Sequence, residues 1–484
     1  MKCFLKDAPE GAVKGKCGKV MNGDTVAAVS TPRGRGGVAV IRISGDGALG
    51  TAEKVFFPAG GKDVCEIAPR RATYGEVRDL DGRVVDRAVL TTYRGPASFT
   101  GEDVAEISCH GGVSVTRAVL EAVFAAGARP AEAGEFTKRS FINGKMTLSE
   151  AEAVGLLIDS DTEDRLRLSV GAAGGRLKNE LRRITDRLVS SLSYLYAEID
   201  YPDEEITDGS GRDGGEEVLD ALREAESSLG RLLATFRRGS AVADGVKAAV
   251  VGVPNVGKSS LFNALCGDDG AIVTDMPGTT RDVLRRTVSL GGITVLLSDT
   301  AGLREAENEA ESMGVERAVR EMENAELLFA VFDGSRPLTD AERDMMKKYP
   351  AVPRIAVINK CDLEPALSGD ETEEIERNHD ITVRVSCLTG DGIAAVDRAV
   401  ADLFDSDSVD LDSDAVIWDA RQRADLTVAH GLVRDALAAL ESGDSADAVC
   451  TLCESAASKL GETDGRGVTE EIVNGIFSRF CVGK

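Results

Sequence analysis

Short apolar runs alternate with helical stretches across residues 246–404. The apolar runs are predicted to be buried strands, and they are Lys247-Ala248-Ala249-Val250-Val251, Ile293 to Leu297, Arg354 to Ile358 and Thr382 to Val385. Strands that alternate with helices along a chain are typical of a parallel sheet covered by helices. We therefore predict a separate α/β domain over residues 244–405.

Helical patterns flank this domain on both sides. Thr147 and Glu150 form a capping-box pattern at the start of the first stretch. Apolar residues then recur at three- and four-residue steps, which indicates helices with one buried face. They are Leu177, Leu181, Ile184, Leu188, Leu192, Leu195 and Ile199 before a break at Pro202, and then Leu426, Ala429, Val433, Ala436, Leu437 and Leu440, and Ile472, Val473, Ile476, Phe477 and Phe480. We predict that residues 144–243 and 406–484 build one bundle into which the α/β domain is inserted.

The N-terminal part of the chain differs in composition and in the pattern of its apolar residues. Residues 23–143 are rich in glycine and contain short β-like runs, such as Val38 to Ile43 and Arg87 to Tyr93. This pattern predicts a small α+β domain. Residues 1–22 contain lysines but no continuous apolar stretch, which excludes a secretory signal and indicates a disordered leader. Met21 is therefore a candidate start of the natural protein.

The charge of the chain limits the partners that it can have. The sequence has 484 residues and a formal net charge of −25, which argues against broad, non-specific binding of nucleic acid. Any RNA must be held by a local basic patch or by a second protein. One candidate patch, or equally a solvated helix face, is formed by Arg165, Arg167, Arg176, Lys178, Arg182, Arg183 and Arg187. No apolar run is long enough to cross a bilayer, and we predict a cytoplasmic protein without a membrane partner.

Cysteine and histidine give little material for a metal site. The ten cysteines are irregularly spaced, which is typical of reduced thiols rather than of a disulfide framework. Cys450 and Cys453 form the only Cys-x-x-Cys pattern, and we interpret them as helical residues one turn apart. The three histidines are too few to favour a His-based metal site or a Ser-His-Asp triad.

A phosphate-binding loop follows the first predicted strand of the α/β domain. Gly252-Val253-Pro254-Asn255-Val256-Gly257-Lys258-Ser259 fits the pattern GxxxxGK[ST], and a helix is predicted from Ser260 to Cys266. In this motif the backbone N–H groups wrap the phosphates, Lys258 reaches the β- and γ-oxygens, and the Ser259 hydroxyl binds Mg²⁺. The motif alone identifies a nucleotide phosphate and not the base.

The base is identified by a second motif further along the chain. The predicted strand that begins at Arg354 ends in Asn359-Lys360-Cys361-Asp362, which fits NKxD. The Asp362 carboxylate can accept hydrogen bonds from guanine N1–H and N2–H₂, whereas adenine presents an acceptor there and leaves the carboxylate unpaired. Ser386, Cys387 and Leu388 follow another predicted strand, at the place expected for a loop that supports the base.

Two switch motifs lie between these loops. Gly278-Thr279-Thr280-Arg281-Asp282 offers Thr280 as a second hydroxyl for Mg²⁺ and Arg281 as a candidate catalytic residue. In Asp299-Thr300-Ala301-Gly302, Asp299 is expected to hold Mg²⁺ through water and the Gly302 N–H to meet the γ-phosphate. Leu303 then stands where many small GTPases have a glutamine that orients the attacking water. Another residue must orient that water, and Arg304, Glu305, Glu307, Glu309 and Glu311 follow.

Four motifs in the right order and spacing predict a guanine-nucleotide site. The predicted GTP-binding residues are Asn255, Val256, Gly257, Lys258, Ser259, Ser260, Thr274, Asp275, Met276, Pro277, Gly278, Thr279, Thr280, Asp299, Thr300, Ala301, Gly302, Asn359, Lys360, Asp362, Ser386, Cys387 and Leu388. The predicted fold is multidomain, with an α+β N-terminal domain, an all-α helical bundle and an inserted Ras-like α/β (P-loop) G domain.

At this point the sequence resembles the tRNA modification GTPase MnmE (TrmE) family, from residue 24 to the end. Outside the G domain the resemblance rests on five segments: Thr31-Pro32-Arg33-Gly34-Arg35-Gly36-Gly37, Ser98-Phe99-Thr100-Gly101-Glu102-Asp103, His110-Gly111-Gly112, Gly134-Glu135-Phe136-Thr137 and the terminal Phe480-Cys481-Val482-Gly483-Lys484. The family usually ends in Cys-Ile-Gly-Lys, so Val482 departs from its pattern, as does the long leader.

The resemblance implies how the protein works. It implies a folate-binding N-terminal domain that forms a homodimer, and a flavoprotein partner, MnmG, with which an aminomethyl-type group is placed on the wobble uridine of certain tRNAs. A tetrahydrofolate such as 5-formyltetrahydrofolate supplies the one-carbon unit. The resemblance also implies that K⁺ stimulates hydrolysis when two G domains dimerise across their nucleotides, so that the cation takes the place of an arginine finger.

Site residues carry over from the family by position. The K⁺ ligands are Asn255 and backbone carbonyls of Thr274, Met276 and Thr279, and Glu311 orients the water. The implied folate residues are Arg42, Glu106, Lys145 and Lys484, and Cys481 is a candidate chemical residue. Cations suit the glutamate carboxylates of a folate, and an acid suits the N–H edge of a pterin. Read singly, each of the four folate residues is favoured as an ordinary surface charge, and Cys481 is equally a small residue packed beside Phe480.

Two other functions stay open at this stage. A regulatory or ribosome-assembly GTPase would only bind RNA, but Gly171-Ala172-Ala173-Gly174, a formal GxxG, lies in a helical pattern without the flanking strands of a KH loop. An ATPase is disfavoured by Asp362. The two ends of the chain favour a GTPase of tRNA modification.

Overall fold

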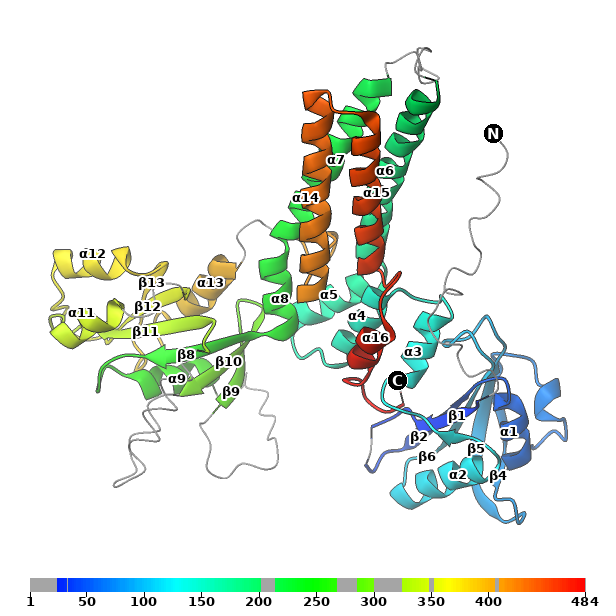
Figure 1. Cartoon of the computed structure of the whole chain (residues 1–484). Helices are drawn as coiled ribbons and strands as arrows, with labels where there is room; N and C mark the ends of the chain where they lie inside the picture. The colour runs from blue at the N-terminus through cyan, green and yellow to red at the C-terminus, as the bar shows by residue number, and fades with distance from the viewer. Residues whose placement is uncertain are drawn as a thin grey trace. The chain divides into compact units, whose positions relative to one another are not determined.

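The computed structural model describes residues 24–32, 34–201, 214–267, 285–299, 324–347, 352–404 and 409–483. Its contacts divide the chain into two compact units. The first contains residues 1–155 together with residues 461–484, and the second contains residues 156–460. The described residues nearest to the two ends of the chain therefore belong to one unit (Figure 1). In the described part of the chain, none of the helices is long and apolar enough to cross a membrane.

The first unit is built on one sheet. Its described strands lie in the order β3-β4-β5-β6-β2-β1-β7, and they are β1 (Val26–Val29), β2 (Val38–Ser44), β3 (Phe56–Pro58), β4 (Thr73–Arg78), β5 (Val84–Tyr93), β6 (Val104–His110) and β7 (Arg129–Pro130). The sheet packs on α1 (Ala48–Val55) and α2 (Val113–Ala125). The α+β domain expected from the sequence is confirmed, and alternate residues of β2 and β6, such as Ile41 and Ile107, are buried in its core.

The C-terminal segment packs within this first unit. Helix α16 (Glu470–Phe477) contacts α3 (Glu135–Ile142), and its Val473 and Phe477 share a small core with Leu148 and Ala151 of α4 (Leu148–Ile158). The sequence predicted residues 406–484 to be one part of a helical bundle, and α16 packs on α4, a helix from the other predicted part of that bundle, as well as on α3. An apolar stripe shows that a helix face is buried, but it does not show which element covers that face.

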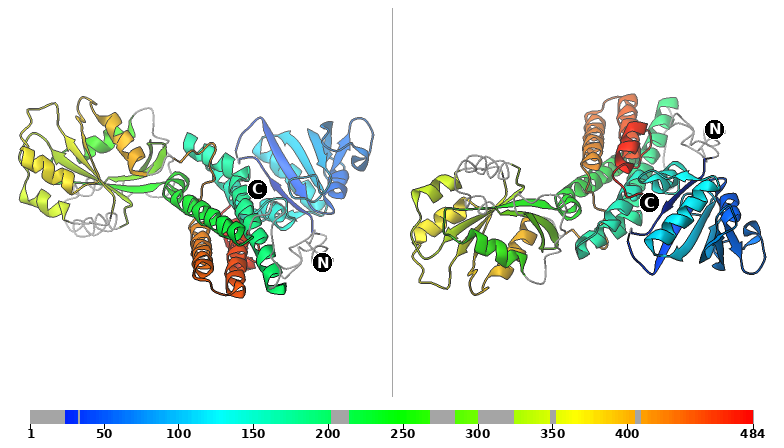
Figure 2. Two further views of the ribbon diagram at one scale, coloured as in Figure 1. Left: turned by 90° about the horizontal axis from the view of Figure 1, so that it is seen from above. Right: turned by 90° about the horizontal axis from the view of Figure 1, so that it is seen from below.

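The helical part of the second unit is a bundle. It contains α5 (Glu163–Ala173), α6 (Arg176–Asp200), α7 (Gly214–Ala234), α8 (Phe236–Asp244), α14 (Ala420–Ser442) and α15 (Ala446–Thr463). The stripes expected on α6 and α14 are buried in one core with α7 and α15, although the two helical pairs are far apart in sequence. Figure 2 shows α14 in orange beside α15 in red from both further directions. Cys450 and Cys453 lie one turn apart on α15 and are both buried, as predicted.

The candidate basic patch divides between two helices and is largely neutralised. Gly175 has a φ of +81° and separates α5 from α6. Arg183 and Arg187 both pair with Glu224 of α7, Arg167 pairs with Glu163, and Arg182 pairs with Asp186. The Arg176 guanidinium donates to the carbonyl of Leu411 at 2.7 Å. These partners favour the interpretation of the patch as a solvated helix face rather than as an RNA site.

The inserted domain is the α/β domain expected from the sequence. Its described strands lie in the order β13-β12-β11-β8-β10-β9, and all neighbouring pairs are parallel except β9 with β10. They are β8 (Val246–Val251), β9 (Arg285–Leu290), β10 (Ile293–Asp299), β11 (Leu327–Asp333), β12 (Arg354–Asn359) and β13 (Ile381–Arg384). The described helices are α9 (Lys258–Cys266), α11 (Asp340–Met346), α12 (Gly369–Arg377) and α13 (Ile393–Phe404). Every residue of β11 is buried, as expected for a central parallel strand.

Candidate functional site

The phosphate-binding loop connects β8 to α9 in the predicted position. Asn255 and Gly257 have φ values of +66° and +103°, so the chain turns through left-handed conformations before α9 begins at Lys258. The Lys258 ammonium donates to the carbonyl of Val253 at 2.8 Å and thus lies back over the loop. The backbone N–H groups of the first turn of α9 face the place of an anion, because a helix N-terminus leaves them without intrahelical acceptors.

Asn359 joins the phosphate loop to the loops that read the base. Its Nδ2 donates to the carbonyl of Val256 at 2.9 Å, and its Oδ1 accepts from the backbone N–H of Cys387 at 3.0 Å. Asn359 is 3% exposed, so both bonds lie away from water. A Cβ atom on Gly257 would come within 2.1 Å of Asn359 Nδ2, which explains why glycine is required at that position. The three loops are therefore held in one arrangement by a single side chain.

The base-reading carboxylate is anchored by the loop after β13. The Ser386 hydroxyl donates to Asp362 Oδ1 at 2.5 Å, and Ser386 is 1% exposed while Asp362 is exposed. Because this bond fixes Oδ1, it also fixes the orientation of the carboxylate and therefore of its second oxygen. Burial, followed by the charge of Asp362, raises the pKa of the Cys387 thiol to about 11, so this thiol stays protonated at neutral pH. Leu388 is 86% exposed at the rim of the loop.

The metal ligands are only partly described. Ser259 lies in the first turn of α9 with an exposed side chain, and Asn255 is exposed in the loop before it. An exposed hydroxyl and an exposed amide oxygen at this place suit Mg²⁺ and K⁺ as oxygen-binding cations. Asp299 ends β10, the strand beside β8, so its backbone lies at the same edge of the sheet. The described residues contain no group of three or more His, Cys, Asp or Glu that could hold a metal by itself.

Both switch segments fall outside the described residues. The predicted site residues in this position are Thr274, Asp275, Met276, Pro277, Gly278, Thr279, Thr280, Arg281, Thr300, Ala301, Gly302 and Glu311, together with the terminal Lys484. Their roles stay predictions.

A second polar site lies in the first unit, around Arg42. Its guanidinium pairs with Glu106 on the neighbouring strand at 2.9 Å. It also lies over two rings, 5.3 Å from the centroid of Phe99 and 5.5 Å from that of Phe136. The hydroxyl of Tyr93 reaches Glu106 at 3.5 Å, and burial followed by the Glu106 charge raises the pKa of Tyr93. An ion pair beside two aromatic faces can both stack a flat heterocycle and bond its polar edge.

The rings at this site are set by helix α3. Ser140 of α3 donates to the carbonyl of Phe99 at 2.8 Å, and Asn143 just after it donates to the carbonyl of Thr100 at 2.8 Å. The Lys145 ammonium donates to the carbonyl of Pro96 at 2.9 Å. Residues 96–100 are therefore bonded repeatedly to the α3 segment, which itself carries Phe136. The structure brings three of the predicted folate residues, Arg42, Glu106 and Lys145, to this one unit.

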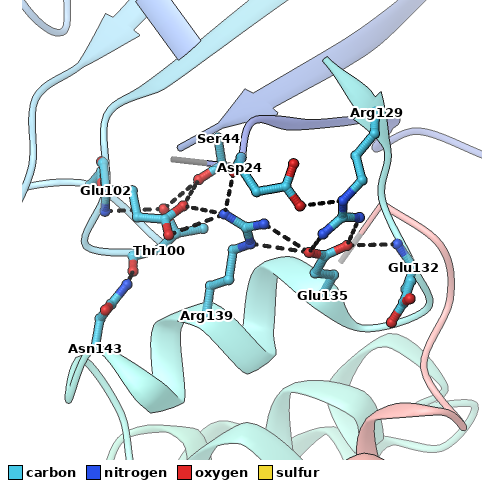
Figure 3. A network of polar contacts seen from close by, with 10 residues as sticks. Asp24, Ser44, Thr100, Glu102, Arg129, Glu132, Glu135, Arg139 and Asn143 are labelled. Atoms are coloured by element: carbon cyan, nitrogen blue, oxygen red, sulfur yellow. Dashed lines mark hydrogen bonds and ion pairs between the residues drawn. The ribbon is translucent and has the colours of Figure 1, made fainter. Parts of the chain in front are cut away.

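Buried charges hold the same two segments together (Figure 3). Arg139 of α3 donates to Glu135 at 2.8 Å and to Glu102 at 3.1 Å, and its side chain is 7% exposed. Glu135 also accepts two bonds from Arg129, which pairs in addition with Asp24. Sequence analysis missed this network. One indication of the network was present in the sequence, namely that Glu102 and Glu135 lie in family motifs to which no chemical role could be assigned.

The described end of the chain lies against the end of β1 and the start of α3. Gly134 N–H donates to the carbonyl of Cys481 at 3.4 Å, and the Ser30 hydroxyl donates to the carbonyl of Gly483 at 2.9 Å. Gly483 has a φ of +101°, and a Cβ there would come within 2.2 Å of the Val29 carbonyl. Val482 is half exposed, which explains why valine is tolerated where the family usually has isoleucine. The Cys481 side chain is exposed.

Comparison with known proteins shows the family of the chain. A family model described as the GTP-binding protein TrmE N-terminus matches residues 25–145, and one described as the MnmE helical domain matches residues 148–481. The chain is 40% identical over 468 residues to the tRNA modification GTPase MnmE of Roseiflexus sp. (strain RS-1), covering 95% of this chain and 99% of that protein. The chain belongs to the tRNA modification GTPase MnmE family. The MnmE of Symbiobacterium thermophilum is 39% identical over 468 residues and is covered along 100% of its length.

Proposed function

We propose that the protein hydrolyses GTP to drive a tRNA modification. With an MnmG-type flavoprotein it adds an aminomethyl-type (carboxymethylaminomethyl) group at carbon 5 of the wobble uridine of certain tRNAs, using a tetrahydrofolate one-carbon unit. The observation that carries this proposal is the joint geometry of Asn359, Asp362 and Ser386, which ties a phosphate loop to a carboxylate suited to guanine. The net charge of −25 favours a tRNA held mainly with the partner protein. The proposed place of action is the cytoplasm.

The residues of the chain divide the work on GTP. The loop N–H groups and Lys258 bind the phosphates, and Asp362 orients the guanine. Ser259 and Thr280 would hold Mg²⁺, and Asn255 with the carbonyls of Thr274, Met276 and Thr279 would hold K⁺. These cations supply fixed positive charge beside the phosphates as negative charge develops on them. Glu311 orients the attacking water in place of the glutamine that Leu303 replaces, and Arg281 is a further candidate.

The first test compares GTP hydrolysis by the purified full chain in K⁺ and in Na⁺ at equal ionic strength. We expect K⁺ to raise the rate at least about tenfold, because a bound cation stabilises the transition-state charge. Asn255→Ala and Glu311→Ala are expected to remove this stimulation.

Asn255 has a φ of +66°, so alanine there adds backbone strain to the loss of the amide. Asn255→Gly is the matched control, because it removes the amide without strain. Loss of stimulation in both variants supports a ligand role, whereas loss in Asn255→Ala alone points to strain. Equal, slow rates of the wild type in both salts would eliminate the K⁺ mechanism.

The folate part of the proposal rests on Arg42 with Glu106 between two aromatic rings. We expect Arg42→Gln to weaken binding of 5-formyltetrahydrofolate to the full chain by about 10- to 100-fold, because a charge-assisted bond is lost. Isothermal titration calorimetry measures this directly.

Arg78→Gln is the matched control for that experiment. Arg78 also pairs with a glutamate on its sheet, Glu76, and also lies over a phenylalanine ring, that of Phe57 at 4.7 Å. It belongs to β4, at the β3 end of the sheet. Equal weakening by both substitutions would contradict a folate site at Arg42.

A further inference from the structure

A buried carboxylate lies beside the base-reading loop and has no part in the motifs. Asp333 is the last residue of β11, and it is the register partner of Asn359 on β12. The two strands are neighbours in the sheet, as Figure 1 shows. The side chain of Asp333 is 7% exposed. A buried carboxylate is costly unless it is paired and hydrogen-bonded, so its contacts should explain its presence.

Both oxygens of Asp333 are engaged. Oδ1 accepts from the backbone N–H of Ser335 at 3.0 Å and from the Ser335 hydroxyl at 2.6 Å, which fixes the carboxylate in the turn after β11. Oδ2 accepts from the Lys360 ammonium at 2.6 Å. Burial raises the pKa of Asp333, but the bonds from Lys360 and Ser335 outweigh burial and lower it overall. Asp333 is therefore ionised at neutral pH.

The lysine that Asp333 holds belongs to the NKxD motif. Lys360 has a φ of +65° and lies between Asn359, which bonds the phosphate loop, and the loop that carries Asp362. Its side chain is 33% exposed, and within the part of the chain that the structure describes its ammonium is held by Asp333. A lysine side chain has four methylene groups and loses considerable rotamer freedom when it is ordered.

We propose that Asp333 is a positioning residue of the nucleotide site, which holds Lys360 extended beside the base-reading loop before the nucleotide enters. The ion pair orders the methylene groups of Lys360 in advance, so this entropy is not lost again on binding. It also neutralises the ammonium, so that its charge is not left without a partner next to the base. This inference rests on the proposed binding of a guanine nucleotide.

Asp333→Asn separates this role from a structural one. The amide keeps an oxygen for both Ser335 bonds but loses the charge that holds Lys360. Arg336, whose Nε lies 3.8 Å from Asp333, keeps its two-pronged pair with Glu342 at 2.9 Å, so the turn has an independent support. The matched control is Ser335→Ala, which loses a hydroxyl bond to the same carboxylate but leaves the pair with Lys360 in place.

The experiment measures binding of fluorescent mant-GDP to the full chain in wild type, Asp333→Asn, Lys360→Met and the double variant. We expect Asp333→Asn to weaken binding about 3- to 10-fold, which corresponds to the cost of ordering one long side chain. In the Lys360→Met background the same change should have less than about a twofold effect, because the two residues act through one contact. Ser335→Ala should bind as the wild type does.

Three results would overturn the inference. First, Asp333→Asn could bind mant-GDP as tightly as the wild type. Second, Asp333→Asn could lower the affinity by the same factor in the Lys360→Met background as in the wild type. Third, Ser335→Ala could bind mant-GDP as weakly as Asp333→Asn does. The last two would show that Asp333 supports the fold of the loop rather than Lys360. Failure of the wild type itself to bind mant-GDP would instead contradict the proposed function, so the two failures are distinguishable.

Discussion

Replacing Asp362 with asparagine is expected to shift nucleotide preference from GTP to xanthosine triphosphate (XTP). The carboxylate accepts from two donors on guanine, N1–H and N2–H₂, whereas the asparagine amide sets a donor against N2–H₂. Xanthine has an oxygen at that position and pairs with the amide. A site built to bond one polar group rejects a ligand that leaves it unpaired, so we expect GTP affinity to fall at least about 100-fold. Competition of GTP, XTP and ATP against labelled GDP measures the shift.

Asp391→Asn provides a matched control for that experiment. Asp391 is an exposed carboxylate in the same loop as Ser386 and accepts from the Thr389 hydroxyl at 2.8 Å. The substitution Asp391→Asn is expected to leave the protein with a higher affinity for GTP than for XTP, as in the wild type. An equal loss of GTP and XTP binding in Asp362→Asn would show that Asp362 supports the Ser386 loop rather than reads the base. If ATP displaced labelled GDP from the wild type as well as GTP does, the protein would have to be considered an ATPase.

The G domain could be predicted closely because its signals are local. Buried parallel strands appear as continuous apolar runs, and each functional residue stands at a fixed offset from the end of one of them. The structure accordingly finds Asn359 and Asp299 as the last residues of β12 and β10. Asp333 also ends such a strand. It was missed because the apolar run of β11 was not among the predicted strands, and because its partner Lys360 becomes its neighbour only when β11 and β12 pair.

The first unit was harder to predict because its decisive contacts join distant segments. Glu102 and Arg139 are separated by 37 positions, and Ser30 and Gly483 by 453. In the sequence Glu102, Glu135 and Arg139 are indistinguishable from surface charges, since burial and pairing are properties of the fold. Periodicity identifies the buried face of an element, and tertiary packing decides its partner.

Arg139→Met is expected to destabilise the first unit by about 3–5 kcal/mol, the range for a buried ion pair that loses one member. Methionine keeps an unbranched apolar stem, although a shorter one, but leaves the Glu102 carboxylate, whose side chain is 13% exposed, without its cation. Hydrogen–deuterium exchange of the full chain, followed in peptides from residues 98–143, reports this loss for the unit alone. The loop at Phe99 should exchange faster as well, because α3 holds it.

Arg117→Met is the control for a surface ion pair. Arg117 lies on α2 and faces Glu121 at 3.7 Å, with its side chain 74% exposed. Exposed pairs contribute less than about 1 kcal/mol, so exchange in the same peptides should scarcely change. If Arg139→Met and Arg117→Met altered exchange equally, the network of Figure 3 would stabilise the first unit no more than an exposed ion pair does.

The pH dependence of this destabilisation identifies its cause. Burial raises the pKa of Glu135, but bonds from Arg129, the Glu132 N–H and Arg139 outweigh burial and lower it from 4.5 to about 2. Because the folded-state pKa is depressed, the stability that Glu135 contributes is fully present above about pH 4.5 and is lost as the pH falls to about 2. The difference between wild type and Arg139→Met should therefore shrink over this window. A difference that stayed constant would mean that Arg139 acts by packing, and that its charge is immaterial.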